Sequence, residues 1–241
     1  MAQKIVFASG KGGVGKSSVA LGLARTLAAR NIKVLLVDFD IGLRSLDMML
    51  GVSEQVAFDW GDALLGNAEP ENCMIRMDSL ALMAAPMDYD DAFEPEAVRS
   101  LFCGIEADFD FILFDAPAGL GRGFELACSA ADAAVLVTTP DSVCVRSCAA
   151  AARRLRQTEC NHLALIINRF EEKPVIKKNL LNIDDCIDAV AVRLGGVIPE
   201  DAAVVQSSVT GKQPDKKAPS SRAYDRIGRR LLGEKVKLFE D

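Results

Sequence analysis

The chain has 241 residues, of which half are hydrophobic, and its 28 basic and 34 acidic residues give a formal net charge of −6. This length is enough to bury a sizeable core, and the acidic balance does not favour broad electrostatic capture of nucleic acid. No apolar run reaches the roughly 18 residues of a membrane-spanning helix, and no signal peptide precedes the first expected strand. We therefore expect a cytoplasmic protein whose membrane contact, if any, is peripheral, at the inner face of the cell membrane.

Seven cysteines are spread along the chain without a Cys-x-x-Cys pair. Their odd number and apolar neighbours are typical of free thiols in a reducing compartment rather than of a disulfide framework. Cys144 and Cys148 are four residues apart and would share one face of a helix. This spacing leaves a metal or redox role open, although small core residues are the better interpretation.

The first expected elements are a short buried strand over residues 4–9 and a helix over residues 18–30. Between them lies a glycine-rich loop that fits the phosphate-loop pattern of Gly, four residues and Gly-Lys-Ser. Glycines let the backbone wrap a phosphate, and the amides and dipole of the following helix favour the anion. A glycine-rich turn without a ligand is the alternative. The predicted nucleotide contacts in this loop are Gly10, Lys11, Gly12, Gly13, Val14, Gly15, Lys16, Ser17 and Ser18.

Two side chains of this loop have specific predicted roles. Lys16 is expected to reach the β- and γ-phosphates of a nucleotide, and the Ser17 hydroxyl is expected to ligate Mg²⁺. A second apolar strand, over residues 33–37, then delivers Asp38 and Asp40 to its carboxyl end. Ligands of open parallel sheets bind at that edge, so these carboxylates should lie near the phosphate loop.

The next segment carries weaker signals. Arg44 and Asp47 either form a local ion pair or face a partner. The acidic loop over residues 86–95 does not match a calcium-binding EF-hand, and we interpret its carboxylates as solvated. The elements expected in this segment are a loop with a short helix (41–51), a short helix (59–65), a strand (80–84) and a helix (96–102).

A strand over residues 109–114 ends in Asp115 and continues into Ala-Pro-Ala-Gly. An apolar strand that ends in aspartate is what a Walker B element requires, because its carboxylate must reach Mg²⁺ at the phosphate edge of the sheet. The pattern is weak alone and becomes strong behind a complete phosphate loop. We therefore predict that Asp115 belongs to the Mg²⁺ site.

The second half of the chain continues to alternate apolar strands with helices. Asn168 closes the last long strand, where its amide could read the edge of a purine base or simply begin a turn. Pro199 and Asp201 follow a short strand and could border a base or ribose. The expected elements are strands at 133–139, 163–167 and 196–198, helices at 142–157 and 183–192, a polar, basic segment at 171–182 (Lys173, Lys177 and Lys178), and a loop-like segment at 212–221.

This alternation predicts an α/β fold, with a doubly wound, mostly parallel sheet and helices on both faces, as in P-loop NTPases. We find no internal repeat or long linker, so we expect a single domain over residues 1–241. Residues 222–241 should form a C-terminal helix, capped by Ser221, and a short tail. Tyr224, Ile227 and Leu231 share one stripe of that helix.

Together these motifs resemble the deviant Walker A ATPases of the ParA/MinD group, over essentially the whole chain to about residue 233. The first motif defines the wider group, and the Asp-Phe-Asp-Ile-Gly-Leu-Arg phrase points to the MinD branch, whose members determine the septum site in bacterial cell division. The matching motifs are residues 11–17, 37–44, 114–119 and 196–201.

The resemblance implies ATP and Mg²⁺ as cofactors and an ATP-bound homodimer as the active state. Lys11 would be the signature lysine that reaches the partner subunit's nucleotide, and with Lys16 and Asp40 it would make up the catalytic set. Asp40 would position or activate the attacking water, Asp38 would support the Mg²⁺ shell beside Ser17 and Asp115, and Asn168 would contact adenine. Turnover should be slow unless a partner activates it.

Two departures from the MinD pattern bear on partners. The tail over residues 234–241 is too short, and too acidic at its end, to insert well into a membrane alone. The usual acidic residues after Val145 and Arg146 are missing, so Min-type protein regulators remain possible partners but would meet an atypical docking face. The residues near that face are Ser147, Ala149, Arg153, Arg154 and Arg156.

Three other functions remain open. A ParA-like partition ATPase would bind DNA through a basic patch such as 153–156, 177–178 or 229–230, although DNA is not an expected partner of this acidic chain. An iron–sulfur cluster carrier would need paired cysteines at a dimer interface. A small-molecule kinase or ligase would need an acceptor site, which no motif indicates.

Overall fold

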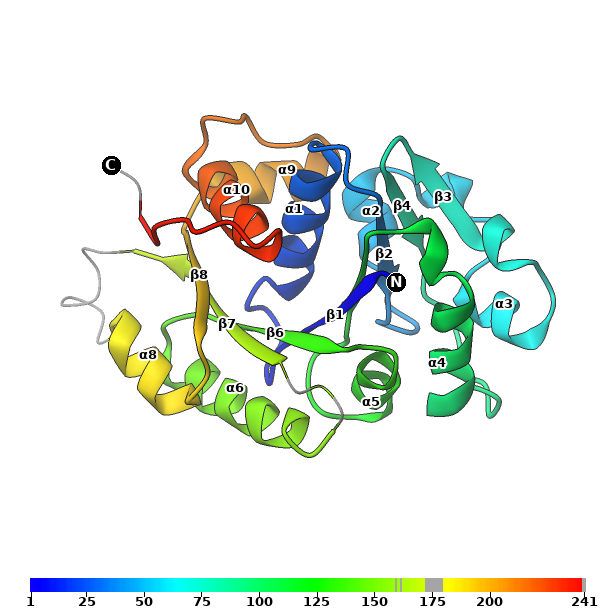
Figure 1. Cartoon of the computed structure of the whole chain (residues 1–241), viewed down its shortest axis with the longest axis horizontal. Helices are drawn as coiled ribbons and strands as arrows, with labels where there is room; N and C mark the ends of the chain where they lie inside the picture. The colour runs from blue at the N-terminus through cyan, green and yellow to red at the C-terminus, as the bar shows by residue number, and fades with distance from the viewer. Residues whose placement is uncertain (159, 161, 172–179, 240–241) are drawn as a thin grey trace.

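The computed structural model describes residues 1–158, 160, 162–171 and 180–239. Eight strands within these residues form one sheet, in the order β3-β4-β2-β5-β1-β6-β7-β8. Neighbouring strands are parallel except for β3 and β4, which are antiparallel. Helices cover both faces of this sheet (Figure 1), so the predicted doubly wound, mostly parallel α/β fold is confirmed.

The strands are β1 (Gln3–Ala8), β2 (Val34–Asp38), β3 (Met74–Met77), β4 (Leu80–Met83), β5 (Phe111–Asp115), β6 (Ala133–Thr138), β7 (His162–Phe170) and β8 (Leu194–Pro199). The helices are α1 (Lys16–Ala28), α2 (Leu46–Leu50), α3 (Trp60–Leu65), α4 (Pro95–Gly104), α5 (Arg122–Ser129), α6 (Ser142–Leu155), α8 (Ile183–Val190), α9 (Ala202–Thr210) and α10 (Pro219–Leu231). Short 3-10 turns lie at Ser53–Gln55, Pro70–Cys73 and Glu106–Asp108.

The sheet separates two hydrophobic clusters, because successive side chains of a strand point to opposite faces. In β1, Ile5 and Phe7 pack in the cluster under α1 and α10, whereas Val6 and Ala8 pack in the cluster under α4, α5 and α6. Both faces of the sheet are therefore buried under helices, which explains why the strand sequences are continuous apolar runs.

Some elements differ from the sequence expectation. The antiparallel strand β3 and the helices α5 and α9 were not predicted. The last helix begins at Pro219, because proline is favoured in the first turn of a helix. Ser221 therefore lies inside the helix and does not cap it, and the neighbouring Ser220 hydroxyl donates to Asp201. As expected, Tyr224 and Ile227 are buried and Leu231 packs beside them. Lys173, Lys177 and Lys178 lie outside the described residues.

All seven cysteines lie within the described residues and none forms a disulfide, which agrees with the thiol interpretation. Cys144 and Cys148 are buried in the core, whereas Cys103 is exposed. Within the described part of the chain, no group of three or more His, Cys, Asp or Glu side chains is arranged to hold a metal ion. The small-core interpretation of Cys144 and Cys148 therefore fits their surroundings.

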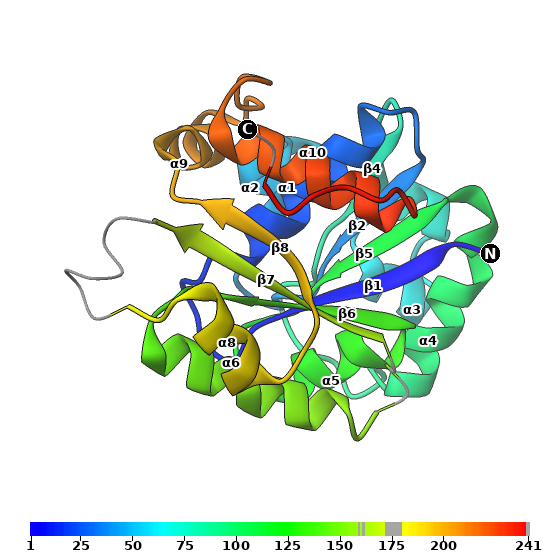
Figure 2. The ribbon, with the colours of Figure 1, turned by 60° about the vertical axis from the view of Figure 1, so that its left-hand side comes forward.

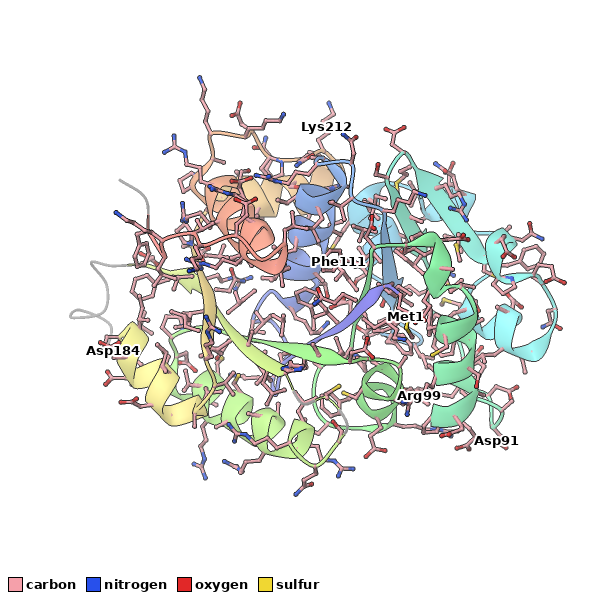
Figure 3. The ribbon with its side chains drawn as sticks, viewed as in Figure 1. Met1, Asp91, Arg99, Phe111, Asp184 and Lys212 are labelled. Atoms are coloured by element: carbon pink, nitrogen blue, oxygen red, sulfur yellow. The ribbon has the colours of Figure 1, made fainter. Side chains whose placement is uncertain are left out.

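The predicted acidic loop is solvated. Asp88, Asp90, Asp91 and Glu94 are exposed, and Figure 3 shows Asp91 at the outer rim of the molecule, near α4.

In the part of the chain that the structure describes, no helix has the length and apolar composition that crossing a membrane requires.

The C-terminal segment 234–239 folds back along α10 (Figure 2). The Arg230 guanidinium donates to the Val236 carbonyl from Nε (3.1 Å) and Nη2 (3.0 Å), and to the Gly195 carbonyl from Nη1 (2.8 Å). Val236 and Leu238 are half-buried, whereas Phe239 is exposed. This segment is thus docked on the body of the protein, and residues 240–241 lie outside the described chain.

The helix that follows the phosphate loop is held by a close approach of α10. A Cβ atom on Gly22 would lie 2.5 Å from the Tyr224 ring, and the Tyr224 hydroxyl donates to the Ser18 carbonyl at 3.3 Å. We expect Gly22→Ala to lower the free energy of unfolding by about 1–3 kcal/mol, because the buried ring must shift. Urea denaturation measures this loss.

Gly104→Ala is the matched control for that substitution. Gly104 is also helical, and nothing lies within 4 Å of the position that its Cβ would take. Its replacement should be neutral or stabilising by up to about 1 kcal/mol, through helix propensity alone. Equal losses in the two variants would contradict the packing interpretation.

Candidate functional site

The phosphate loop joins β1 to α1 at the carboxyl edge of the sheet. Gly13 and Gly15 have φ angles of +81° and +86°, which only glycine adopts readily, and α1 begins at Lys16 directly after them. The open space around Gly13, where an added Cβ would meet no atom within 4 Å, lies beside the amides of the helix start. This arrangement is an anion cradle of the phosphate-loop kind.

Lys16 and Asp115 form a buried ion pair across the site. The two side chains are 8% and 0% exposed, and Lys16 Nζ lies 2.5 Å from Asp115 Oδ1 and 3.3 Å from the Ser17 hydroxyl. Asp115 ends β5, which pairs with both β1 and β2, so the sheet itself brings this carboxylate to the loop. The sequence prediction had placed both residues here.

Asp38 lies opposite Asp115 in the register of β2 and β5 and is almost completely buried. Its Oδ1 accepts the Asp40 amide (2.8 Å), and its Oδ2 accepts the Ser45 (2.9 Å) and Leu46 (3.1 Å) amides. Burial, together with the charge of Asp115, raises the pKa of Asp38, and these amide bonds oppose the rise. Asp38 therefore holds the loop after β2 in a fixed shape.

Asp40 is half-buried at the start of that loop, two residues after the end of β2. Burial raises the pKa of its carboxyl, with a smaller contribution from Asp38, and the charge of Lys16 partly offsets the shift. Asp40 thus shares one electrostatic environment with Lys16 and Asp38. The predicted water-positioning role of Asp40 is chemically compatible with this location.

A cluster of aromatic side chains packs against the loop that follows β2. The Trp60 Nε1 group donates to the Asp38 carbonyl at 2.9 Å, and the Trp60 and Phe39 rings stack with centroids 5.0 Å apart. Phe39 and Phe114, which directly precede Asp40 and Asp115, meet edge to face at 5.7 Å. Packed aromatic rings therefore restrict the backbone next to both Asp40 and Asp115.

Lys11, near the start of the loop, is exposed. Hydrogen bonds from the Cys144 and Val143 amides lower the pKa of Asp141, and the charge of Lys11 contributes a smaller part, which places Lys11 near the first turn of α6. In contrast to Lys16, its ammonium forms no ion pair with the described residues.

Asn168 does reach the phosphate loop, although its observed contact is not with a base. It is 6% exposed, and its Nδ2 donates to the Val14 carbonyl at 2.8 Å. A Cβ on Gly15 would lie 2.3 Å from the same nitrogen. Asn168 therefore locks the loop against β7, and its predicted contact with adenine stays a prediction.

Pro199 and Asp201 lie where β8 leads into α9, but the Asp201 carboxylate is engaged within the protein. Its Oδ1 accepts the Ala203 amide, and its Oδ2 accepts the amide (3.0 Å) and hydroxyl (2.7 Å) of Ser220. Burial alone would raise the pKa of Asp201, but these hydrogen bonds outweigh it and lower the pKa. Asp201 thus caps α9 and ties it to α10, and the base or ribose contact stays a prediction.

The donor set at this edge fits Mg²⁺. Asp115 Oδ2 is buried and has no hydrogen-bond partner among the residues that the structure describes, which is unfavourable unless a cation or ordered water satisfies it. The Ser17 hydroxyl and two buried carboxylates, Asp38 and Asp115, supply the oxygen ligands that this ion prefers. The predicted metal residues are therefore together at one point of the site.

One feature of the site was missed at the sequence level, and one open alternative is now decided. Ser45 and Leu46 supply amides to Asp38, and their position just before a short helix was the available signal. Arg44 and Asp47 form the local pair that was one of two open interpretations, at 3.1 Å, with Asp47 buried.

Comparisons with known proteins agree with this geometry. A family model described as ParA, NUBPL iron-transfer P-loop NTPase, matches residues 1–231. The septum site-determining protein MinD of Helicobacter pylori is 36% identical over 252 residues, which cover 100% of this chain and 94% of that protein.

Two solved structures are also similar. A chain of the MinC:MinD cell division complex of Aquifex aeolicus has a TM-score of 0.90 and 33% identity, with 99% of both chains covered. MinD of Pyrococcus horikoshii, solved with Mg-ADP, has a TM-score of 0.85 and 25% identity, with 98% of this chain and 100% of that chain covered.

Proposed function

The chain belongs to the MinD-type branch of the ParA/MinD family of P-loop NTPases, and we propose that it is an ATP-hydrolysing switch that dimerises with ATP and acts in division-site placement. The observation that carries the proposal is the pairing of two lysines in one loop. Lys16 is buried against Asp115, whereas Lys11 is exposed at the rim. We propose that Lys16 serves the nucleotide of its own subunit, whereas the exposed Lys11 is available to a second copy.

The proposed nucleotide site uses the loop amides and Lys16 for the phosphates. With ATP bound, Lys16 would contact phosphate oxygens in place of Asp115, and Asp115, Ser17 and Asp38 would hold Mg²⁺. The bound ion supplies positive charge on the phosphate oxygens. Mg-ADP in the P. horikoshii relative supports this choice of cofactors.

The proposed dimer completes the site. Lys11 of each subunit would add positive charge to the partner's nucleotide, while Asp40 positions the attacking water. Because an isolated subunit lacks the second lysine, turnover should be slow until a second copy, and then an activating partner, stabilises the competent arrangement. ATP would thus shift the equilibrium between a monomer and a dimer.

A Min-type regulator is the proposed partner class, because the A. aeolicus relative was crystallised with MinC. The candidate docking helix, α6, is basic in this chain. Its Arg146 and Arg153 are exposed, whereas Arg154 already pairs with Glu125 at 2.6 Å. We therefore propose a partner whose contact surface is acidic. Independently of the partner, we propose that the chain is a single-domain protein that works in the cytoplasm.

Membrane contact, if it occurs through the tail, is proposed to be peripheral and to require release of residues 234–239. Val236 and Leu238 are half-buried, so their apolar surface is only partly available to lipid while Arg230 holds the segment. Dimerisation would place two such tails on one particle.

The test of the switch is Asp40→Ala in Mg-ATP. If Asp40 positions the water, the variant should bind ATP and accumulate as a dimer in multi-angle light scattering, with phosphate release reduced about 100-fold or more. The double variant Lys11→Ala/Asp40→Ala is the control and should remain monomeric. A monomeric Asp40→Ala protein that is saturated with ATP would rule out the dimerising switch.

The same samples separate the division-site function from DNA partition. Sedimentation with anionic liposomes and, in parallel, with duplex DNA should show ATP-dependent recovery with liposomes or with an added Min-type partner. ATP-dependent, salt-sensitive recovery with DNA alone would instead favour a ParA-like function.

A further inference from the structure

A cavity of about 500 Å³ is lined by residues of α1, α9 and α10 and of the loop that joins the last two helices. Figure 1 shows these three helices close together on one face of the sheet. Its volume is in the range of small-molecule sites. Leu21, Met49 and Val204 give it an apolar wall, and hydroxyl groups of Thr26, Ser208 and Ser221 line the rest. It shares only Ser18 with the predicted nucleotide contacts.

Positive charge converges on this cavity. Its lining includes five cationic side chains and a single carboxylate, Asp225, which pairs with Arg30 at 2.6 Å. The other four cations form no ion pair with any residue that the structure describes; they are Arg25, Lys216, Arg222 and Arg226. Figure 3 shows the chain entering this loop at Lys212, beside α9 and α1.

Arg25 is the most informative of these cations, because it is half-buried and has only neutral partners. Its Nη1 donates to the Ser207 hydroxyl at 3.1 Å, and its Nη2 donates to the Gly211 carbonyl at 2.7 Å. Burial lowers the pKa of Arg25, which means that desolvation disfavours the charged form. A charge removed from water without a counter-ion is costly, and an anion in the cavity would offset that cost.

We propose that this cavity binds a small phosphate-bearing ligand of about nucleotide size. Arg25, Arg222 and Arg226 would hold its anionic group, since guanidinium groups bind phosphate oxygens through paired hydrogen bonds. The apolar wall would take the uncharged part. A nucleic acid duplex fits less well, because Arg25 lies on the inner helix α1, enclosed by α9 and α10, rather than on a convex surface.

The cavity also touches the elements that shape the nucleotide site. Arg25 and Ser18 are on α1, which begins at the phosphate loop, and Tyr224 of α10 donates to the Ser18 carbonyl. Asp201, beside the predicted base contact, is tied to Ser220 of α10. A ligand that orders α9 and α10 would therefore change the affinity for nucleotide, and nucleotide would change the affinity for that ligand by the same factor.

The test is calorimetric titration of inorganic pyrophosphate into protein saturated with Mg-ADP, at constant free Mg²⁺. One additional pyrophosphate should bind per chain, and raising the ADP concentration tenfold should not weaken it. Arg222→Gln/Arg226→Gln should weaken it by about tenfold or more. The matched control is Arg146→Gln/Arg153→Gln, which removes two exposed arginines of α6 and should leave it unchanged.

A second variant tests the cavity rather than the charge. Ser208→Trp would fill the space while keeping all four cations, and it should abolish the additional site without changing the affinity for Mg-ADP. Absence of a second site in the unmodified protein, equal affinity in both arginine pairs, or displacement by ADP would overturn the proposal. Tighter binding of a 20-base-pair DNA duplex than of pyrophosphate, weakened by the same arginine variants, would assign the cations to nucleic acid instead.

Discussion

Lys16→Ala protein is expected to lose ATP binding and hydrolysis together. The substitution removes a buried cation of the phosphate site, and phosphate contacts of this kind contribute about 10²–10³-fold to turnover. It also leaves Asp115, which is fully buried, without its counter-ion. Breaking a buried pair in this way costs about 3–5 kcal/mol, so the nucleotide-free variant should also unfold at lower urea concentration.

Equilibrium binding of a fluorescent ATP analogue and single-turnover phosphate release measure the two losses. Lys11→Ala is the control, because Lys11 is exposed and forms no ion pair with the described residues. It should bind nucleotide as a monomer with nearly unchanged affinity and fail only to dimerise. If Lys11→Ala lost nucleotide binding as completely as Lys16→Ala, the division of labour between the two lysines would be wrong.

The carboxyl edge of the sheet was predictable because local pattern and topology act together there. A parallel sheet brings the ends of its strands to one edge, so Asp38 and Asp115, each at the end of an apolar run, had to meet. The glycine loop between a strand and a helix then fixed which ligand that edge would favour. These inferences needed only the period of the apolar residues and the position of the breaks.

Contacts between distant segments were less predictable. The spacing of the motif explains Gly10 as a residue that wraps phosphate, but the structure adds another cause: a Cβ there would lie 2.0 Å from the Ser147 carbonyl oxygen of α6. Likewise, Asn168 and Asp201 carry the polar groups that sequence reasoning assigned to a base or ribose, yet each binds the protein's own backbone. Polar side chains near a site can serve the ligand or the scaffold, and only the three-dimensional contacts separate these uses.

The cationic cavity illustrates the same limit of sequence reasoning. Arg25 belongs to the first helix, whereas Arg222 and Arg226 belong to the last, so nearly 200 positions separate side chains that line one space. No local pattern marks such a set. The cavity forms beside a close contact between two helices. Gly22 has no side chain, so α10 packs closely against one side of α1, and α9 covers the adjacent side, which carries Arg25.

Asp115→Asn should affect Mg²⁺-dependent hydrolysis and Mg²⁺-free ATP binding in opposite directions. The amide keeps the shape of the carboxylate but removes its charge, so Mg²⁺-dependent ATP hydrolysis should fall by about 10²-fold or more. In the unmodified protein Lys16 is held by Asp115, and any phosphate must compete with that carboxylate. Binding of ATP without Mg²⁺ should therefore be unchanged or tighter in the variant, because the competitor has lost its charge.

This opposite response is the measurement that decides the role of Asp115. Titrations of ATP in EDTA and in Mg²⁺ should diverge, with weaker binding in Mg²⁺ and none of that weakening in EDTA. Loss of affinity in both titrations would mean that Asp115 acts by shaping the loop around Lys16. Its Oδ2 is buried and has no partner within the described part of the chain, and an oxygen that only shaped the loop would be expected to have one.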